Sequence, residues 1–213
     1  MRKLLTEFIG TFFLVLTVCL TVAGGVPWAA LAIGSALMVM VYMGGHVSGA
    51  HYNPAVSLAA VLRGALPRGE LVGYWVAQLL GAAAAAFAGS LIAGKTIPFQ
   101  PGDGVSAFSA LLVEILFTFA LALVVLNVAT SRQTAGNSFY GLAIGFTITA
   151  AAFAGGPISG GAFNPAVGTG PMLVHALSGG GSFGWLWLYW VGPLAGGALA
   201  ALVFRMQEGE GGS

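Results

Sequence analysis

The stretch Ser48-Gly-Ala-His-Tyr-Asn-Pro-Ala-Val56 recurs later in the chain as Ser159-Gly-Gly-Ala-Phe-Asn-Pro-Ala-Val167. Proline suits the first position of a helix, because its missing N–H would be unsatisfied there in any case. Asparagine directly before it is a favoured helix cap. The triplets Asn53-Pro54-Ala55 and Asn164-Pro165-Ala166 therefore each predict the start of a short helix.

This recurrence is part of a longer duplication. Two further blocks match in the same order: EFIGTFFL at 7–14 with EILFTFAL at 114–121, and YWV at 74–76 with YWV at 189–191. Three matched blocks in one order are hard to obtain by chance. We expect a single domain over residues 1–206, made of repeats at about 1–96 and 107–206, followed by a flexible C-terminal tail at 207–213.

Composition places the chain in a membrane. Of its 213 residues, 58% are hydrophobic and only 6% are charged, against roughly a quarter charged in soluble domains. Seven basic and six acidic residues cannot coat a soluble surface of this size, and the 34 glycines suit closely packed membrane helices. The bilayer is therefore the expected solvent for most of the chain.

Six apolar segments have about the length that spans a bilayer, roughly 20 residues. They lie at about 7–24, 28–46, 70–93, 107–130, 137–155 and 183–206. Two stretches that hold the triplets, 48–63 and 159–176, are too short or too rich in glycine to span. A signal peptide is the alternative for the first segment, but Glu7 interrupts its apolar core.

Each repeat holds three spans, an odd number, so the second copy enters the membrane from the opposite face. The two triplet segments then approach the midplane from opposite sides, as in other inverted-repeat membrane proteins. The predicted fold is an all-α membrane protein, with six transmembrane helices and two re-entrant half-helices in an inverted repeat.

Basic residues predict the orientation of the spans. With the N-terminus inside, the cytoplasmic side receives Arg2, Lys3, Arg63, Arg68, Arg132 and Arg205. Only Lys95 falls outside. We therefore expect both termini in the cytoplasm and the protein in the cell membrane.

The meeting of two half-helix N-termini suggests what the triplets do. Each N-terminus carries a partial positive charge, and the side-chain amides of Asn53 and Asn164 can donate hydrogen bonds to an oxygen passing between them. A cation there cannot recover its hydration, whereas a neutral molecule with a lone pair loses little. One such triplet alone is most simply a helix cap, but two at matching places favour a pore for uncharged molecules.

The segments 46–56 and 157–171, which carry these triplets, resemble those of the aquaporin, or major intrinsic protein, family. The resemblance covers about residues 4–206, and the doubled motif is highly specific. It implies a right-handed bundle of six helices and two half-helices, with one pore in each protomer of a homotetramer. It also implies a passive channel for water and small neutral solutes.

Four ionisable residues inside the predicted membrane region are functional candidates by default. Glu7 and Glu114 occupy equivalent places in the first and fourth spans; a catalytic carboxylate pair is one alternative, but no third group accompanies it. In the resembling family this pair accepts hydrogen bonds from the re-entrant loops, and we expect that role here. His46 and His51 lack a third metal ligand nearby, and are expected to brace the first loop or to line the cytoplasmic vestibule.

Other polar and aromatic residues have simpler interpretations. His175 is expected to follow the second half-helix and to face the outer mouth or solvent. The pairs Tyr74-Trp75 and Tyr189-Trp190 resemble anchors at the membrane interface rather than a binding box. Cys19 is the only cysteine, and its apolar surroundings predict a small buried hydrophobe.

Water-specific members of the family carry an arginine directly after the second triplet, facing an aromatic residue and a histidine in a narrow outer constriction. The four equivalent positions of this chain are Ile33, Ala152, Gly161 and Val167. None has a polar side chain, so we expect a wider and more apolar constriction. Some plant vacuolar-membrane members also have valine after this triplet.

The choice of solute is a separate prediction. Glycerol-conducting relatives usually pair that arginine with an aspartate one position later, where this chain has Gly168, so a typical glycerol facilitator is not predicted. We expect a pore for water together with small neutral solutes such as ammonia, urea or hydrogen peroxide. The alternative is a channel mainly for ammonia, urea, glycerol or hydrogen peroxide.

Other classes of function remain as alternatives. A secondary transporter also has inverted repeats and broken helices, but coupled transport needs a titratable or ion-binding group at the midplane, and Glu7 and Glu114 lie near the ends of their spans. An intramembrane enzyme is disfavoured, because no Ser-His, paired-Asp or His-Glu-x-x-His arrangement occurs. A structural membrane-junction role would leave a folded tetramer without flux. The net charge of +1 predicts no nucleic-acid partner, and no cofactor or metal site is expected.

Overall fold

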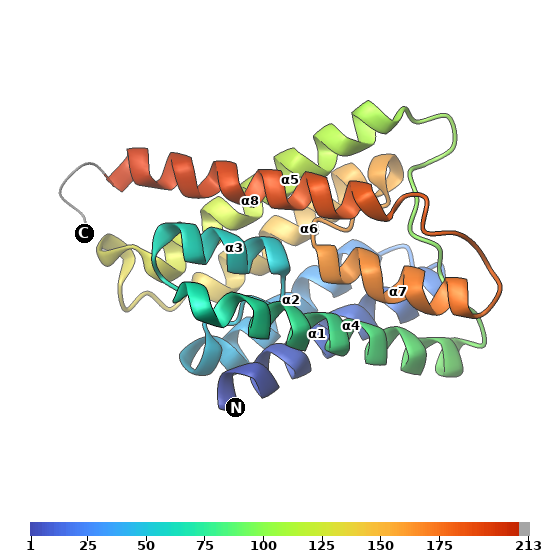
Figure 1. Ribbon diagram of the computed structural model, residues 1–213, viewed down its shortest axis with the longest axis horizontal. Coiled ribbons are helices and arrows are strands. Elements are labelled where there is room, and N and C mark those ends of the chain that lie inside the picture. Colours follow the sequence, from blue (N-terminus) through green and yellow to red (C-terminus); the bar gives the residue numbers. More distant parts are fainter. Residues whose placement is uncertain (209–213) are drawn as a thin grey trace.

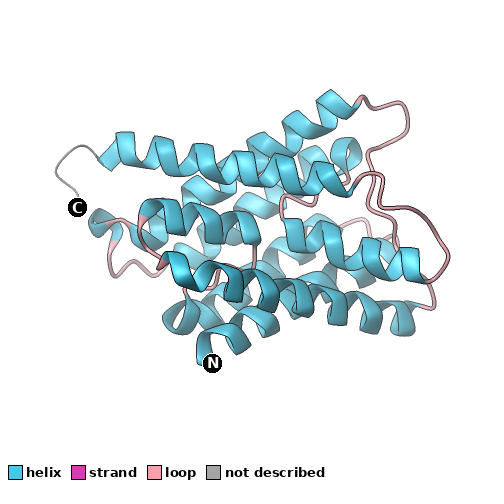
Figure 2. Cartoon of the chain, in the orientation of Figure 1, coloured by secondary structure: helices cyan, strands magenta, loops and turns pink. Residues whose placement is uncertain are grey.

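The computed structural model describes residues 1–208, and within them the regular structure is helical (Figure 2). Six helices are long and apolar enough to cross a membrane. They are α1 (Arg2–Ala23), α2 (Ala29–Ser48), α4 (Leu71–Ala93), α5 (Ala107–Thr130), α6 (Tyr140–Ser159) and α8 (Leu186–Glu208). Two shorter helices are α3 (Pro54–Arg63) and α7 (Pro165–Leu177). Single 3-10 turns lie at η1 (Arg68–Glu70) and η2 (Arg132–Thr134).

The predicted fold class is confirmed, with six spans and two short helices in the expected order. The ends of the helices differ from the expected ones by a few residues. The largest difference is at α1, which begins at Arg2 rather than near residue 7. Hydropathy marks only the part of a helix that contacts lipid, whereas backbone hydrogen bonds extend α1 beyond that part to Arg2. Lys3, in this added turn, forms an ion pair with Glu70 at 2.9 Å.

The long helices pack in pairs around the two short ones. Helix α1 packs against α4, α5 against α8, and α2 against α6. Helices α3 and α7 start near the middle of the molecule and run toward opposite ends (Figure 1). The start of α1 and the end of α8 lie at one end of the bundle, whereas the connections 94–106 and 178–185 lie at the other (Figure 1).

Glycine allows two of these helix pairs to approach closely. A Cβ built on Gly81 of α4 would lie 2.5 Å from the carbonyl oxygen of Phe8 in α1. A Cβ on Gly196 of α8 would overlap the carbonyl oxygen of Ile115 in α5. Small residues at such crossings let membrane helices gain van der Waals contact without a hydrophobic driving force.

Replacement of Gly81 by alanine is expected to destabilise the protein, because the new methyl group meets backbone rather than a side chain that could rotate away. Overpacking of this kind costs about 1–3 kcal/mol. The apparent melting temperature in detergent measures the effect. Gly69→Ala is the matched control, because a Cβ built on Gly69 meets nothing within 4 Å. Equal melting temperatures for the two variants would contradict the close approach of α1 and α4.

The C-terminal end of α8 differs from the expected tail. Gln207 and Glu208 belong to the helix. The Glu208 carboxylate accepts a hydrogen bond from Ser131 at 2.5 Å and lies 3.6 Å from the Arg63 guanidinium. These two residues are therefore the last of α8 rather than the start of a flexible tail, and Gln207 is exposed while Glu208 is half-buried. The rest of the expected tail, 209–213, lies outside the described residues.

Candidate functional site: a cavity between two helix N-termini

The site is built on the two Asn-Pro-Ala triplets. Pro54 and Pro165 are the first residues of α3 and α7. The Asn53 side-chain oxygen accepts a hydrogen bond from the Ala55 N–H at 2.8 Å, and the Asn164 oxygen accepts one from Ala166 at 2.9 Å. Each asparagine thus caps its helix in extended backbone geometry, and its side-chain NH2 group remains for other partners.

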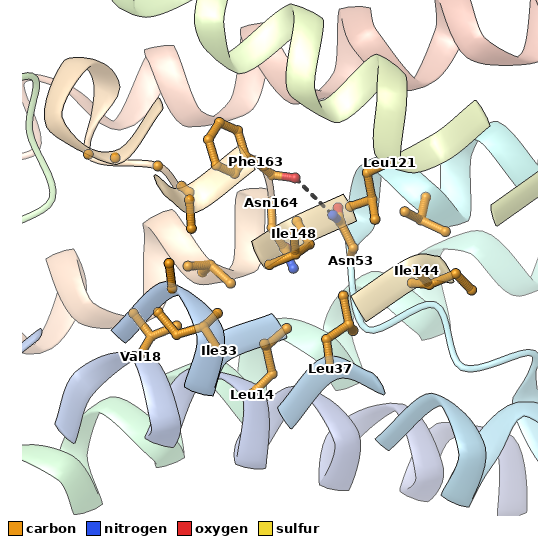
Figure 3. Close-up of a pocket in the computed structure, with 18 of the residues that line it drawn as sticks. Leu14, Val18, Ile33, Leu37, Asn53, Leu121, Ile144, Ile148, Phe163 and Asn164 are labelled. Carbon is orange, nitrogen blue, oxygen red and sulfur yellow. Dashed lines mark hydrogen bonds between the residues drawn. The ribbon is translucent and has the colours of Figure 1, made fainter. Parts of the chain in front are cut away.

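Each of these NH2 groups ties one triplet loop to the other. The Asn53 Nδ2 donates to the Phe163 carbonyl oxygen at 2.9 Å, and the Asn164 Nδ2 donates to the Tyr52 carbonyl oxygen at 2.9 Å. The first of these bonds is the dashed line in Figure 3. A primary amide has two N–H donors, so one per asparagine is left for a molecule in the cavity that both side chains line.

The loops that lead into the short helices contain strained backbone. Ala50, Tyr52 and Phe163 have φ angles of 51°, 49° and 50°. This left-handed region costs a residue with a side chain on the order of 1 kcal/mol or more, and it persists only where the surroundings hold it. Two buried carboxylates supply much of that support.

The Glu7 side chain, fully buried on α1, collects four donors. Its Oε1 accepts from Ser48 Oγ at 2.7 Å and from the His51 N–H at 2.9 Å. Its Oε2 accepts from the Tyr52 N–H at 2.7 Å and from Gln78 Nε2 at 2.8 Å. Both oxygens are therefore occupied by groups that hold the first loop.

Glu114 on α5 repeats this arrangement in the second half with three donors. Ser159 Oγ and the Ala162 N–H donate to its Oε1 at 2.7 and 3.0 Å, and the Phe163 N–H donates to Oε2 at 2.6 Å. The position equivalent to Gln78 is Pro193, which has no side-chain donor. Glu7 and Glu114 thus each accept hydrogen bonds from a re-entrant loop, as expected from the family resemblance.

The tyrosine–tryptophan pairs are not membrane-interface anchors, and that prediction is wrong. Tyr74 and Tyr189 are buried, and their hydroxyls donate to the carbonyl oxygens of Ser48 at 2.7 Å and Ser159 at 2.6 Å. A tyrosine near the end of a predicted span is typical of the membrane interface. The packing of α4 and α8 instead places these two tyrosines against the loops.

The tryptophans of these pairs contact the half-helices. Trp75 Nε1 donates to the Pro54 carbonyl oxygen at 3.0 Å, and Trp190 Nε1 donates to Thr169 Oγ1 at 3.0 Å. Their rings meet edge to face, with centroids 5.7 Å apart. Each tyrosine–tryptophan pair therefore hydrogen-bonds to one loop and to the short helix that follows it.

The histidines occupy three different environments. His51 lines the central cavity, and its Nδ1 lies 3.1 Å from Ser57 Oγ. His46 is exposed at the end of α2, on the rim of a second cavity that η2 also lines. His175 lies within α7 rather than after it, and its Nδ1 is 2.7 Å from Thr96 Oγ1. The expectation that His175 follows the half-helix is therefore wrong, whereas its half-buried side chain leaves the expected exposure at the outer mouth a prediction.

A central cavity of about 150 Å³ runs past the two triplet loops. Figure 3 places Val18 and Ile33 toward one end, Leu37 and Ile144 toward the other, and the asparagines between them. Among the described residues, the polar side chains that line it are those of His51, Asn53 and Asn164, and no Asp, Glu, Lys or Arg does so. This volume is enough for several water molecules.

All four predicted constriction residues line this cavity: Ile33, Ala152, Gly161 and Val167. They come from α2, α6, the second loop and the first turn of α7, so only the tertiary fold brings them together. Sequence reasoning missed Phe99, which lines the same cavity from the connection between α4 and α5. A single aromatic residue in a long connection gives no signal of its position.

Other features of the described residues add no chemistry. Cys19 is buried, as its apolar surroundings predict. Within residues 1–208, no three His, Cys, Asp or Glu side chains gather in a way that could hold a metal ion.

Comparison with known proteins gives a consistent result. The family described as Major intrinsic protein matches residues 1–204. Aquaporin NIP1-1 of Zea mays is 38% identical over 215 residues, which cover 96% of this chain and 74% of the relative. Aquaporin Z of Brucella melitensis biotype 1 is 36% identical, over 96% of this chain and 97% of the relative.

A solved structure shares the fold. The X-ray structure of the aquaglyceroporin from Plasmodium falciparum matches with a TM-score of 0.87 at 22% identity, over 95% of this chain and 94% of that chain. The family match covers residues 1–204, and two capped half-helices meet at the centre of the described bundle. The chain therefore belongs to the major intrinsic protein family.

Proposed function

We propose that this protein is a passive channel that conducts water and small uncharged solutes and excludes ions and protons. The observation that carries the proposal is the central cavity, in which two helix N-termini and the Asn53 and Asn164 amides face an otherwise mostly apolar lining. Membership of the family and relatives named as aquaporins support a channel for water.

Ion exclusion follows from the charges around the triplets. The partial positive ends of α3 and α7 both lie at the cavity beside Asn53 and Asn164, which disfavours a cation there. No acidic side chain among the described residues lines the cavity to offset them. A water or urea oxygen instead accepts hydrogen bonds from the free N–H of each asparagine, so a neutral molecule recovers part of its lost hydration.

The outer part of the cavity supports a solute range wider than water. Gly161 has no side chain, Ala152 has only a methyl group, and Val167 stands where water-specific relatives carry arginine. Their small apolar side chains leave more room than an arginine and a histidine would. We therefore include ammonia, urea and hydrogen peroxide among the proposed solutes, with Ile33, Ala152, Gly161 and Val167 as the positions that choose between them.

A secondary transporter is the second candidate, and the carboxylates argue against it. Coupled transport needs a group that binds and releases an ion where substrate passes. Glu7 and Glu114 do not line the cavity, and each is held by three or four hydrogen-bond donors. Their arrangement supports a structural role, in which they fix the loops of the pore.

Membrane placement and assembly are also proposals. Arg63 lies 3.6 Å from Glu208 at the end of α8, and Arg68 shares η1 with Glu70, which pairs with Lys3 at the start of α1. Arg132 follows Ser131, which donates to Glu208. Lys95 belongs to the connection 94–106, which lies at the other end of the bundle (Figure 1). This distribution supports cytoplasmic termini, and we place the protein in the cell membrane as a separate proposal. The family resemblance supports a homotetramer with one pore per protomer, which native mass spectrometry of the detergent complex tests.

Stopped-flow light scattering of proteoliposomes tests the proposed function. Vesicles that contain the protein are expected to shrink faster than empty vesicles when an impermeant osmolyte is added outside. When urea is added outside instead, they are expected to reswell faster than empty vesicles, because urea enters down its gradient. A trapped pH indicator is expected to show no added proton leak. Flux that saturates and depends on an ion gradient would favour the transporter.

Asn164→Asp is the control variant for ion exclusion. Aspartate can still cap α7, but it replaces the donor NH2 by a negative charge beside the helix N-terminus. We expect a measurable proton or cation leak in this variant and none in the wild-type vesicles.

The wild-type measurements also test the solute range. Water conduction without urea conduction would refute the wide solute range while leaving the water channel in place.

A further inference from the structure

The second cavity, on whose rim His46 lies, continues the central cavity toward one end of the bundle. It has a volume of about 540 Å³ and is lined by the last turns of α2 and α5, the connection 131–139 and the first turns of α6. Ile144 lines both cavities, and Figure 3 places it with Leu37 toward one end of the central one. On each helix the lining continues by one turn: Val41 after Leu37, Ala129 after Val125, and Tyr140 before Ile144. We call the second cavity the vestibule.

One arginine, Arg132, lines the vestibule, and no Asp or Glu of the described chain does so. Arg132 is exposed, and within residues 1–208 it forms no ion pair. His46, which also lines the vestibule, adds either a positive charge or none. Because the described lining of the central cavity holds no Asp, Glu, Lys or Arg, the fixed charge along the two cavities is that of Arg132.

The connection that carries Arg132 is anchored to the end of α5. Thr134 Oγ1 donates to the Asn127 carbonyl oxygen at 2.5 Å, and Asn137 Nδ2 donates to the Val128 carbonyl oxygen at 2.7 Å. Both acceptors belong to the last four carbonyl groups of α5, which have no partner within the helix. The fold therefore fixes the backbone of the connection at the vestibule.

A carboxylate of α8 also reaches this connection. Glu208 accepts a hydrogen bond from Ser131, the residue before Arg132, and lies 3.6 Å from the Arg63 guanidinium. Glu208 does not line the vestibule. Because Arg63 offsets the charge of Glu208, the charge of Arg132 remains to act on the vestibule.

We propose that Arg132 makes the vestibule an electropositive filter, which repels cations before they reach Asn53 and Asn164. Low-dielectric walls around a concave site focus the field of a charge into it. The outer constriction has Val167 where water-specific relatives carry arginine, so this chain places its positive charge at the opposite end of the path. An uncharged solute is not repelled. The inference rests on the proposed function, because it adds a second barrier to the exclusion of cations.

Thiol modification measures the potential of the vestibule without any flux. Ala135 lines the vestibule and is exposed, so Ala135→Cys places a reactive thiol there. The reaction rates with an anionic and a cationic methanethiosulfonate reagent, the ethylsulfonate and the ethyltrimethylammonium compounds, are compared in detergent. Cys19 is buried, and the protein without the added cysteine gives the background rate.

In the Ala135→Cys protein, we expect Arg132→Gln to lower the ratio of the anionic to the cationic rate by at least about threefold at low ionic strength. The difference should shrink in about 1 M salt, where the screening length is about 3 Å. Arg132→Lys keeps the charge and should keep the ratio. Arg68→Gln is the matched control, because Arg68 is exposed in η1 and lines neither cavity.

Cation leak measures the consequence for the pore. Asn164→Asp weakens the central barrier, and the addition of Arg132→Glu reverses the charge at the vestibule. We expect the double variant to leak K⁺ from proteoliposomes at least about threefold faster than Asn164→Asp alone. Asn164→Asp with Arg68→Glu should leak at the rate of Asn164→Asp. Water flux of each preparation corrects for the amount of folded channel.

The outcomes separate the filter from the proposed function. Equal rate ratios in Arg132→Gln and Arg68→Gln would show that Arg132 does not set the potential of the vestibule, and would overturn the filter. K⁺ leaks that do not change on addition of Arg132→Glu, including no leak in either variant, would remove Arg132 from ion exclusion. Wild-type vesicles that pass neither water nor urea would refute the proposed function, whereas the thiol rates still decide the potential at Arg132.

Discussion

Replacement of Val167 by arginine is expected to reduce urea flux by at least about tenfold, equivalent to about 1.4 kcal/mol in the transfer barrier. Val167 lies in the first turn of α7, is 4% exposed and lines the cavity. A guanidinium there would fill part of the cavity that Ile33 and Ala152 also line, which leaves less room for a solute larger than water. Water flux is expected to fall less, because a single file of waters can pass beside a polar group that hydrogen-bonds to it.

Val167→Met is the matched control, because methionine adds length without charge. If size alone matters, methionine should reduce urea flux nearly as much as arginine does. If the charge and hydrogen bonds of arginine matter, only arginine should do so. Stopped-flow measurements of water and urea on the same vesicle preparation give both rates. Equal losses of water and urea in Val167→Arg would argue against Val167 as a selectivity position.

Loss of the Glu7 carboxylate is expected to have the largest effect on stability. Each oxygen of Glu7 accepts two hydrogen bonds. In Glu7→Gln an NH2 group replaces one of these oxygens, so the two donors that faced it lose their acceptor. Buried donors left unpaired cost about 1–3 kcal/mol each, so we expect a total on the order of 3 kcal/mol and a loss of water flux. Glu114→Gln should cost less, because three donors rather than four face that carboxylate.

Glu70→Gln provides the comparison for this series. Glu70 forms an ion pair with Lys3, but its side chain is 36% exposed. Pairs of this kind are worth about 1 kcal/mol or less, so the apparent melting temperature should hardly move. A Glu7→Gln protein as stable as Glu70→Gln would show that the carboxylate does not hold the first loop.

The repeated Asn-Pro-Ala triplet made the centre of the molecule predictable. An asparagine cap and a proline at the first helical position are local requirements, which depend on neighbours in sequence, so α3 and α7 begin where the pattern indicates. The apolar lengths of the six spans are also local. For these reasons the fold class follows from the sequence alone.

Features that depend on distant neighbours were predicted less well. Tyr74 and Tyr189 were expected at the membrane interface, but they donate to loop carbonyl oxygens. His175 was expected beyond its helix, but it contacts Thr96 in another connection. A side chain near a helix end can face lipid, water or a loop, and only the packing of the other helices decides which.

The sequence by itself determined the two capped half-helices and the six spans, because these follow from residue type and local spacing. The positions Ile33, Ala152, Gly161 and Val167 came from the resemblance to the family. Only the tertiary structure decided that Phe99 joins these four at the cavity, and that the triplets are tied to each other through Phe163 and Tyr52. The physical reason is that a pore is a space between elements. Its width depends on which side chains from separate helices and connections meet there, and no single segment contains that information.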